Sequence, residues 1–261
     1  MILRPSPVPY FRDLGLIVAA VAALLILPWM GMNAGLTVGP ALAGLDSEGA
    51  FVFITVHHVV QGGVAFALIG LLVAAGGSWR EFGFAWGDVR LALRVVAIFT
   101  VIYTILTFGF DFLPFAIRGD QPGLAYQFTS ANVIGVLAFE WLVVGVSEEI
   151  LFRGLIMGLL ARVFGGTVRL GLGRAAFHVS VAGIIAAAIF AFAHTVAYSR
   201  AFFLPFSFEP NWVQVVQAFV LGIYYAALRE KTGSLLGAIV SHNISDGLYM
   251  SMTFLAVAVA H

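Results

Sequence analysis

Long apolar runs, repeated along most of the chain, constrain the fold of this protein more than any other feature of its sequence. A helix needs roughly 20 apolar residues to cross the hydrocarbon core of a bilayer, and seven segments approach or exceed that length. Apolar residues make up 61% of the chain and charged residues only 10%, whereas about a quarter of a typical soluble domain is charged. A water-soluble globule could not bury so much apolar surface. We therefore expect an all-α, polytopic membrane helix bundle.

The predicted spans have similar lengths, apart from a fourth that is too long for a simple perpendicular crossing. They are Leu14–Met32, Phe51–Ala75, Leu91–Leu113, Ala131–Leu160, Val179–Tyr198, Trp212–Leu228 and Leu235–Val259. A polar stretch at 241–247 interrupts the last, which forms one span or two shorter helices and gives seven or eight transmembrane helices. Because no loop is long enough for a core of its own, we expect one integral membrane domain over residues 1–261.

Lys and Arg in the short loops predict the orientation, because cytoplasmic loops carry an excess of positive charge. Ten of the thirteen fall in one set of alternating loops that includes the N-terminal segment, whereas the opposite set holds only Arg118 and Arg200. This asymmetry predicts a cytoplasmic N-terminus. The first apolar run is longer than the apolar region of a signal peptide, so we expect a retained span. Thirteen Asp and Glu balance the basic residues, so no net positive charge favours a nucleic-acid partner.

Ionisable side chains within the predicted spans each require an explanation, because a charge at the bilayer centre costs at least about 2.5–3.5 kcal/mol. Six of the ten lie in three short segments of the second half, at 148–153, 190–194 and 242–246. The other four are expected to have structural roles: His57, His58, Asp111 and Glu140.

The spacing within the first segment separates two adjacent carboxylates. Glu149 and Arg153 are four residues apart, so they share a helical face and can form an ion pair. Glu148 points about 100° away, which leaves it available as a base. The alternative is an ion pair that fixes two helices, with Glu148 as a second acceptor.

The other two segments supply imidazoles. His194 alone is typical of an interhelical hydrogen-bond donor. His242 and Asp246 are four residues apart, a spacing that suits metal ligation and equally an ordinary carboxylate–imidazole hydrogen bond. Taken with Glu148, these residues provide the groups needed to activate water and stabilise an oxyanion. We therefore place a candidate active site inside the bundle.

Three ordered motifs carry a specific resemblance. Glu-Glu-x-x-x-Arg at 148–153, Phe-x-x-x-His at 190–194 and His-x-x-x-Asp at 242–246 resemble those of the CPBP intramembrane protease family. That family includes the CAAX prenyl endopeptidases and the bacterial Abi or bacteriocin-processing proteins. The resemblance implies a catalytic core over residues 131–261, whereas residues 1–130 are similar only as apolar, variable spans.

The resemblance implies an endopeptidase that hydrolyses a peptide bond near or within the membrane. By this analogy Glu148 and His194 activate the attacking water, and His242 with Asp246 stabilises the tetrahedral oxyanion. Two further residues of the first motif would support the site: Glu149 and Arg153.

The last motif departs from the family in one residue, because many members carry Asn where this chain has Asp246. An ionised carboxylate accepts hydrogen bonds but donates none. Asp246 is therefore protonated, orients His242 or ligates a cation. The chain has no cysteine, and a set of nitrogen and oxygen ligands suited to zinc would comprise Glu148, His194, His242 and Asp246. The expected cofactor is none, or one divalent cation such as zinc.

Two other classes of protein could use the same buried polar residues. A proton-coupled transporter should show corresponding broken segments in both halves, whereas the polar residues here gather in the second half. A non-catalytic membrane scaffold is the other alternative. The expected partners of an endopeptidase are the lipid bilayer and a membrane-associated or secreted peptide or protein. The short loops and compact chain favour a bacterial inner membrane.

Overall fold

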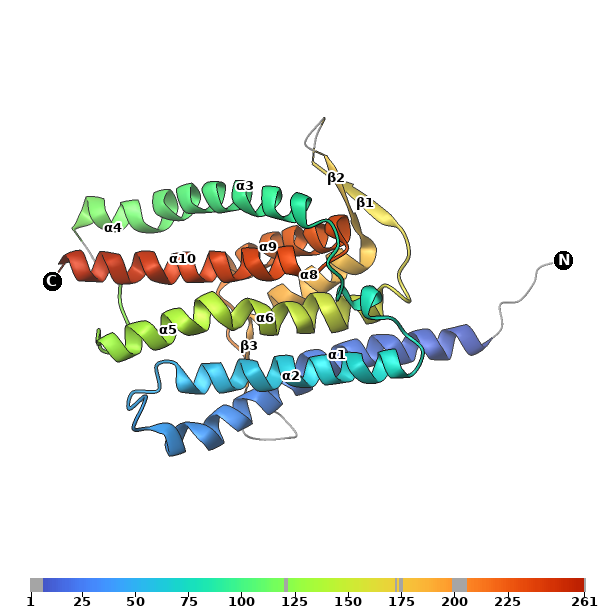
Figure 1. Ribbon diagram of the computed structural model, residues 1–261, viewed down its shortest axis with the longest axis horizontal. Coiled ribbons are helices and arrows are strands. Elements are labelled where there is room, and N and C mark those ends of the chain that lie inside the picture. Colours follow the sequence, from blue (N-terminus) through green and yellow to red (C-terminus); the bar gives the residue numbers. More distant parts are fainter. Residues whose placement is uncertain (1–6, 120–121, 172, 174–175, 199–205, 261) are drawn as a thin grey trace.

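The computed structural model describes residues 7–119, 122–171, 173, 176–198 and 206–260 of the chain. Most of these residues are helical, and the long helices lie side by side along the long axis of the molecule (Figure 1). The α-helices are α1 (Pro7–Val38), α2 (Val52–Ala74), α3 (Val89–Thr107), α4 (Leu113–Arg118), α5 (Ser130–Leu142), α6 (Val144–Glu149), α7 (Met157–Leu160), α8 (Val181–Ala193), α9 (Trp212–Thr232) and α10 (Leu236–Ala260).

Short elements of other kinds complete the described chain. Two 3₁₀ turns, η1 (Gly39–Leu42) and η2 (Trp79–Phe82), follow α1 and α2, and two π-helical segments, η3 (Phe108–Phe112) and η4 (Ile150–Ile156), continue longer helices. Two antiparallel hairpins pair β1 (Thr167–Leu170) with β2 (Phe177–Ser180) and β3 (Val196–Tyr198) with β4 (Phe206–Phe208). The chain is thus mostly helical, as expected, with these two short hairpins in addition.

Five helical segments of the described chain are long and apolar enough to cross a membrane. They are Arg12–Leu42, Val52–Ala74, Val89–Arg118, Ser130–Leu160 and Trp212–Thr232. The membrane helix bundle is therefore confirmed, whereas the predicted number of seven or eight spans is not established. The last predicted span forms one continuous helix, α10, whose 25 residues include the polar stretch.

The predicted span Val179–Tyr198 is wrong in its extent. Helix α8 has only 13 residues, and the chain after it enters strand β3. The side chain of Ser180 caps the first turn by accepting from the Gly183 amide, while Glu230 accepts from the Ser180 amide. The helix then packs along α9 through small residues, such as Gly222 against Ala187. At about 1.5 Å per residue, α8 is about 20 Å long, shorter than the hydrocarbon core.

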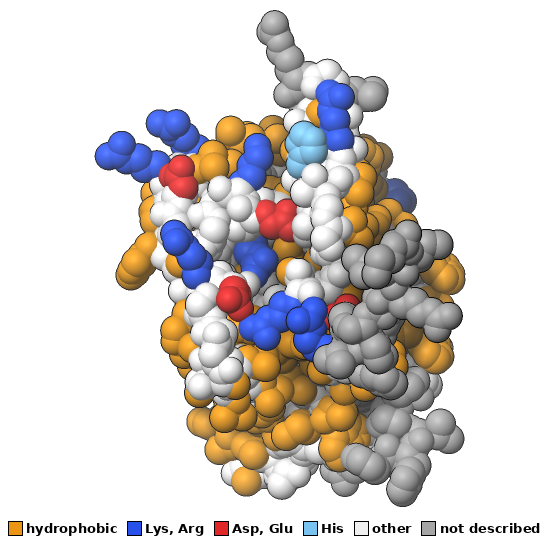
Figure 2. All heavy atoms as spheres, turned by 90° about the vertical axis from the view of Figure 1, so that its right-hand side faces the viewer, with side chains coloured by type: hydrophobic (Ala, Val, Ile, Leu, Met, Phe, Trp, Pro, Cys, Tyr) orange, Lys and Arg blue, Asp and Glu red, His pale blue; other side chains and the backbone are white. Residues whose placement is uncertain are grey.

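The two ends of the bundle differ in charge. The N- and C-termini lie at opposite ends of the long axis (Figure 1). Figure 2 shows Lys and Arg side chains gathered on the end where α1 begins, above a largely apolar flank. This end carries the set of loops that holds most of the Lys and Arg residues of the chain. Three arginines lie outside the described residues: Arg4 and Arg174 of this set, and Arg200 of the opposite set.

Helices α6 and α10 meet at Gly145, the second residue of α6. The Gly145 amide donates to the Asn243 side-chain oxygen over 2.7 Å. A Cβ at this position would lie 2.5 Å from that oxygen and 2.9 Å from both the His242 Cβ and the Ile239 carbonyl oxygen. The absence of a side chain at Gly145 is what lets the two helices approach.

Gly145→Ala should therefore destabilise the bundle by about 1–3 kcal/mol, the usual cost of overpacking. The measurement is the thermal unfolding midpoint of the purified protein in detergent. Gly63→Ala is the matched control, because a Cβ on Gly63 of α2 would meet nothing within 4 Å. Equal midpoints for the two variants would show that the α6–α10 contact is not tight.

Candidate active site

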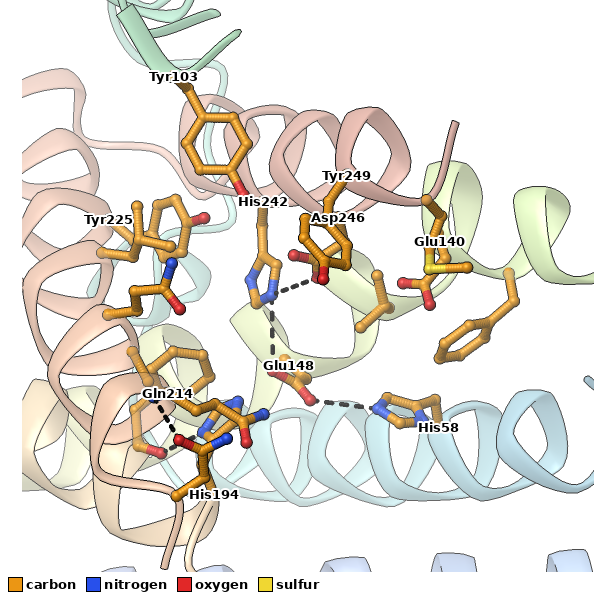
Figure 3. Close-up of a pocket in the computed structure, with 18 of the residues that line it drawn as sticks. His58, Tyr103, Glu140, Glu148, His194, Gln214, Tyr225, His242, Asp246 and Tyr249 are labelled. Carbon is orange, nitrogen blue, oxygen red and sulfur yellow. Dashed lines mark hydrogen bonds and ion pairs between the residues drawn. The ribbon is translucent and has the colours of Figure 1, made fainter. Parts of the chain in front are cut away.

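A cavity of about 660 Å³ lies within the bundle and collects the polar side chains of several helices (Figure 3). All four predicted catalytic residues line its wall: Glu148, His194, His242 and Asp246. They come from α6, the end of α8 and α10. Residues up to 98 positions apart in the sequence thus line one cavity, and the group contains carboxylates and imidazoles in reach of a single bound molecule.

His242 lies between three carboxylates. Its Nδ1 is 2.8 Å from Glu149 Oε1, while its Nε2 is 3.3 Å from Asp246 Oδ2 and 3.6 Å from Glu148 Oε2. The Tyr225 ring stacks on the imidazole at a centroid distance of 4.9 Å. Because Glu149 holds Nδ1 on the far side, the Nε2 atom of His242 faces Glu148 and Asp246 (Figure 3).

Glu149 and Arg153 form a fully buried ion pair behind this imidazole. Arg153 Nη1 donates to Glu149 Oε1 over 2.9 Å, and both side chains are 0% exposed. The guanidinium also lies over the Phe190 ring, 4.2 Å from its centroid, a cation–π contact that stabilises a desolvated charge. The π-helical segment η4 begins directly after Glu149, and such wide turns are frequent at functional sites.

His194 follows the last residue of α8. Its Nδ1 is 2.9 Å from the Phe190 carbonyl oxygen, and because a carbonyl can only accept, Nδ1 carries a proton. In a neutral ring Nε2 is then an acceptor. His194 lines the cavity directly after the point where α8 ends.

The Glu148 carboxylate has a partner that the sequence pattern did not identify. His58 Nε2, on α2, is 3.2 Å from Glu148 Oε1. The expectation of a purely structural role for both His57 and His58 rested on their adjacency, which puts the two rings on different helix faces. The adjacency of the two residues did not indicate which of the two rings faces Glu148. His57 lines a second, smaller cavity of about 170 Å³ that also reaches Glu148.

Two other acidic residues of the predicted spans, Asp111 and Glu140, also line the large cavity. Glu140 lies two turns before Glu148 on the same helical stretch. Tyr103 and Tyr249 also face this part of the cavity (Figure 3). The cavity wall therefore carries two carboxylates, Asp111 and Glu140, that belong to none of the three motifs.

The side chains do not fit the proposed metal site. Within the described ranges, no three His, Asp or Glu side chains are arranged to hold a metal ion. His242 directs Nδ1 at Glu149 and leaves only Nε2, which already has two carboxylates beside it.

An apolar helix bundle with a carboxylate–imidazole cluster in its interior defines an integral membrane protein with the polar groups of a hydrolase. Residues 129–248 match the family described as type II CAAX prenyl endopeptidase, Rce1-like. The resemblance to the CPBP proteases is thereby confirmed, and the family implies a protease. The matched segment contains all three motifs and begins well after the end of α2. No curated protein and no solved structure shows a significant match.

Proposed function

We propose that the protein is an intramembrane endopeptidase in which Glu148 activates a water molecule for attack on a peptide carbonyl. The observation that carries this proposal is the position of Glu148, which shares one cavity with His194, His242 and Asp246. A general base must lie within hydrogen-bond reach of the proton that it removes. Glu148 and His194 line both the large and the small cavity, and we assign the attacking water to the space that they share.

The hydrolysis proceeds without a covalent intermediate. Glu148 takes a proton from the water while the water oxygen bonds to the carbonyl carbon, which gives a tetrahedral oxyanion. An N–H at His242 Nε2 can donate to that oxyanion. Glu148 then returns the proton to the amide nitrogen as the carbon–nitrogen bond breaks, so the products are a peptide ending in a carboxylic acid and a peptide with a free amine, and the proton of the acid then passes to the amine.

Asp246 is assigned to orienting His242 in this scheme. Its Oδ2 lies 3.3 Å from His242 Nε2, and its Oδ1 accepts from the Ser245 hydroxyl at 3.2 Å. An acceptor beside Nε2 favours the protonated nitrogen that an oxyanion requires. The acid at this position thus supports oxyanion binding through the imidazole, where an amide would support it directly.

The substrate proposed is a membrane-associated peptide or protein, including one with a lipidated C-terminus of the kind named in the family description. Apolar side chains make up much of the cavity wall and suit a lipid chain or apolar residues: Ile54, Phe139, Val144, Phe190, Leu221 and Met250. Following the charge asymmetry of the two ends, we place the N-terminus in the cytoplasm and the protein in a bacterial inner membrane.

The test is cleavage by the purified full chain of an internally quenched peptide that ends in a farnesylated CAAX sequence, compared with the same peptide without the lipid. Metal content is measured on the same sample, before and after chelation. We expect cleavage that persists in chelated, metal-free protein. Loss of cleavage on chelation with recovery on adding zinc would contradict the metal-free mechanism. Absence of cleavage in every condition would favour a non-catalytic scaffold or a transporter.

A further inference from the structure

We infer that His58 is the positioning residue for the Glu148 carboxylate, a role that rests on the proposed function. The assignment comes from geometry outside the family match, because α2 lies before residue 129. His58 Nε2 contacts Glu148 Oε1 at 3.2 Å, and the two side chains are only 9% and 16% exposed. A contact so shielded from water fixes the carboxylate more firmly than one at a surface.

The second ring nitrogen of His58 determines what this contact can be. Nδ1 is 3.0 Å from the Ile54 carbonyl oxygen, which can only accept, so Nδ1 carries a proton. If Nε2 and Glu148 Oε1 both lacked a proton, two lone pairs would face each other at 3.2 Å. One proton is therefore shared between Nε2 and Oε1. When Glu148 is the base, that proton resides on His58.

Anchoring Oε1 leaves the other oxygen for chemistry. Glu148 Oε2 points toward His242, 3.6 Å from its Nε2, on the side of the larger cavity (Figure 3). A carboxylate that turned freely about its last torsion would not keep either oxygen directed at the cavity. The His58 contact opposes that rotation, because Oε1 would have to give up a charge-assisted hydrogen bond.

His58 is itself held at its backbone. The Ser147 hydroxyl donates to the His58 carbonyl oxygen over 2.6 Å, and Gln61 Nε2 donates to the same hydroxyl over 3.4 Å. Gly62 lets α2 approach α6, because a Cβ there would lie 2.9 Å from the Ser147 Cα. Since Ser147 precedes Glu148 in the chain, the two helices are fixed to each other directly beside the imidazole–carboxylate contact.

The experiment compares two amide replacements of His58. The amide nitrogen of Gln can occupy the place of Nε2 and donate to Glu148, whereas the shorter Asn reaches only the place of Nδ1. His57→Gln is the matched control on the same helix. With the farnesylated peptide as probe, we expect His58→Asn to lower kcat about 100-fold with KM within about threefold, the upper end for residues that orient a reactive group. His58→Gln should recover about tenfold of that loss, and His57→Gln should stay within about threefold of the wild type.

A kcat for folded His58→Asn within threefold of the wild type, or no difference between the Asn and Gln variants, would overturn the assignment. An infrared measurement keeps the test independent of turnover and of the proposed function. The difference spectrum between wild type and Glu148→Gln isolates the carboxyl bands of Glu148. These bands should shift in the His58→Asn background and remain in place with His57→Gln. Unshifted bands would reject the contact even in a protein that cleaves no peptide. Failure of the wild type to cleave, with shifted bands, would reject only the proposed function.

Discussion

Glu148→Gln should lower the rate of peptide cleavage by at least about a thousandfold, because an amide cannot take a proton from water. The protein should still fold and insert, since Gln has the shape of Glu and removing a charge from the membrane interior lowers the cost of burial. The measurement is kcat/KM for the farnesylated peptide, together with the thermal unfolding midpoint in the same detergent. A variant that retained activity would show that Glu148 is not the base.

Glu140→Gln provides the control for a general effect of removing a carboxylate from the cavity. Glu140 lies on the same helical stretch and lines the same cavity. It belongs to none of the three motifs, so we expect a loss below about tenfold, within the range of a modest electrostatic change. Equal losses in Glu140→Gln and Glu148→Gln would indicate that cavity charge, rather than one positioned base, determines the rate.

Arg153→Met should cause the largest loss of stability among single substitutions at the site. The ion pair of Arg153 with Glu149 is fully buried, and the variant leaves the Glu149 carboxylate without its guanidinium. Breaking a buried pair in this way costs about 3–5 kcal/mol. The thermal unfolding midpoint and the yield of monodisperse protein in detergent measure the effect. Unchanged stability would mean that the His242 contact alone satisfies Glu149.

The double variant Glu149→Gln with Arg153→Met separates charge from shape. It removes both charges at similar volume, and Gln keeps an oxygen that can accept from His242 Nδ1. Replacing both members of a buried pair is often neutral or stabilising, so the double variant should be more stable than Arg153→Met alone. A double variant as unstable as the single one would assign the loss to packing of the guanidinium against Phe190.

Much of the bundle could be predicted from the sequence because only a few kinds of secondary structure can span a bilayer. Backbone groups within hydrocarbon must be satisfied internally, so long apolar runs form helices, as four of the first five predicted spans and Trp212–Thr232 do. Val179–Tyr198 differs because apolar composition alone does not distinguish a full span from a short helix that ends inside the protein. The β3–β4 pairing after α8 is a tertiary feature with no local signal in the apolar pattern.

The candidate site was predictable where its members are close in sequence. Helical spacing placed Glu149 beside Arg153 and His242 beside Asp246, and the structure has both contacts. The partner of Glu148 was not predictable, because His58 precedes it by 90 residues. The contact depends on how α2 packs against α6, and that packing rests on Gly62, whose importance appears only when the opposing Ser147 is known.

The contact between α2 and α6 also bears on how the chain matures during synthesis. Because α2 is synthesised before Glu148, the His58 side chain is already within the membrane when Glu148 is inserted. A lone carboxylate at that depth would resist leaving the translocon. The N-terminal half thus supplies a partner for Glu148 before the later segments that bear His194 and His242 are synthesised.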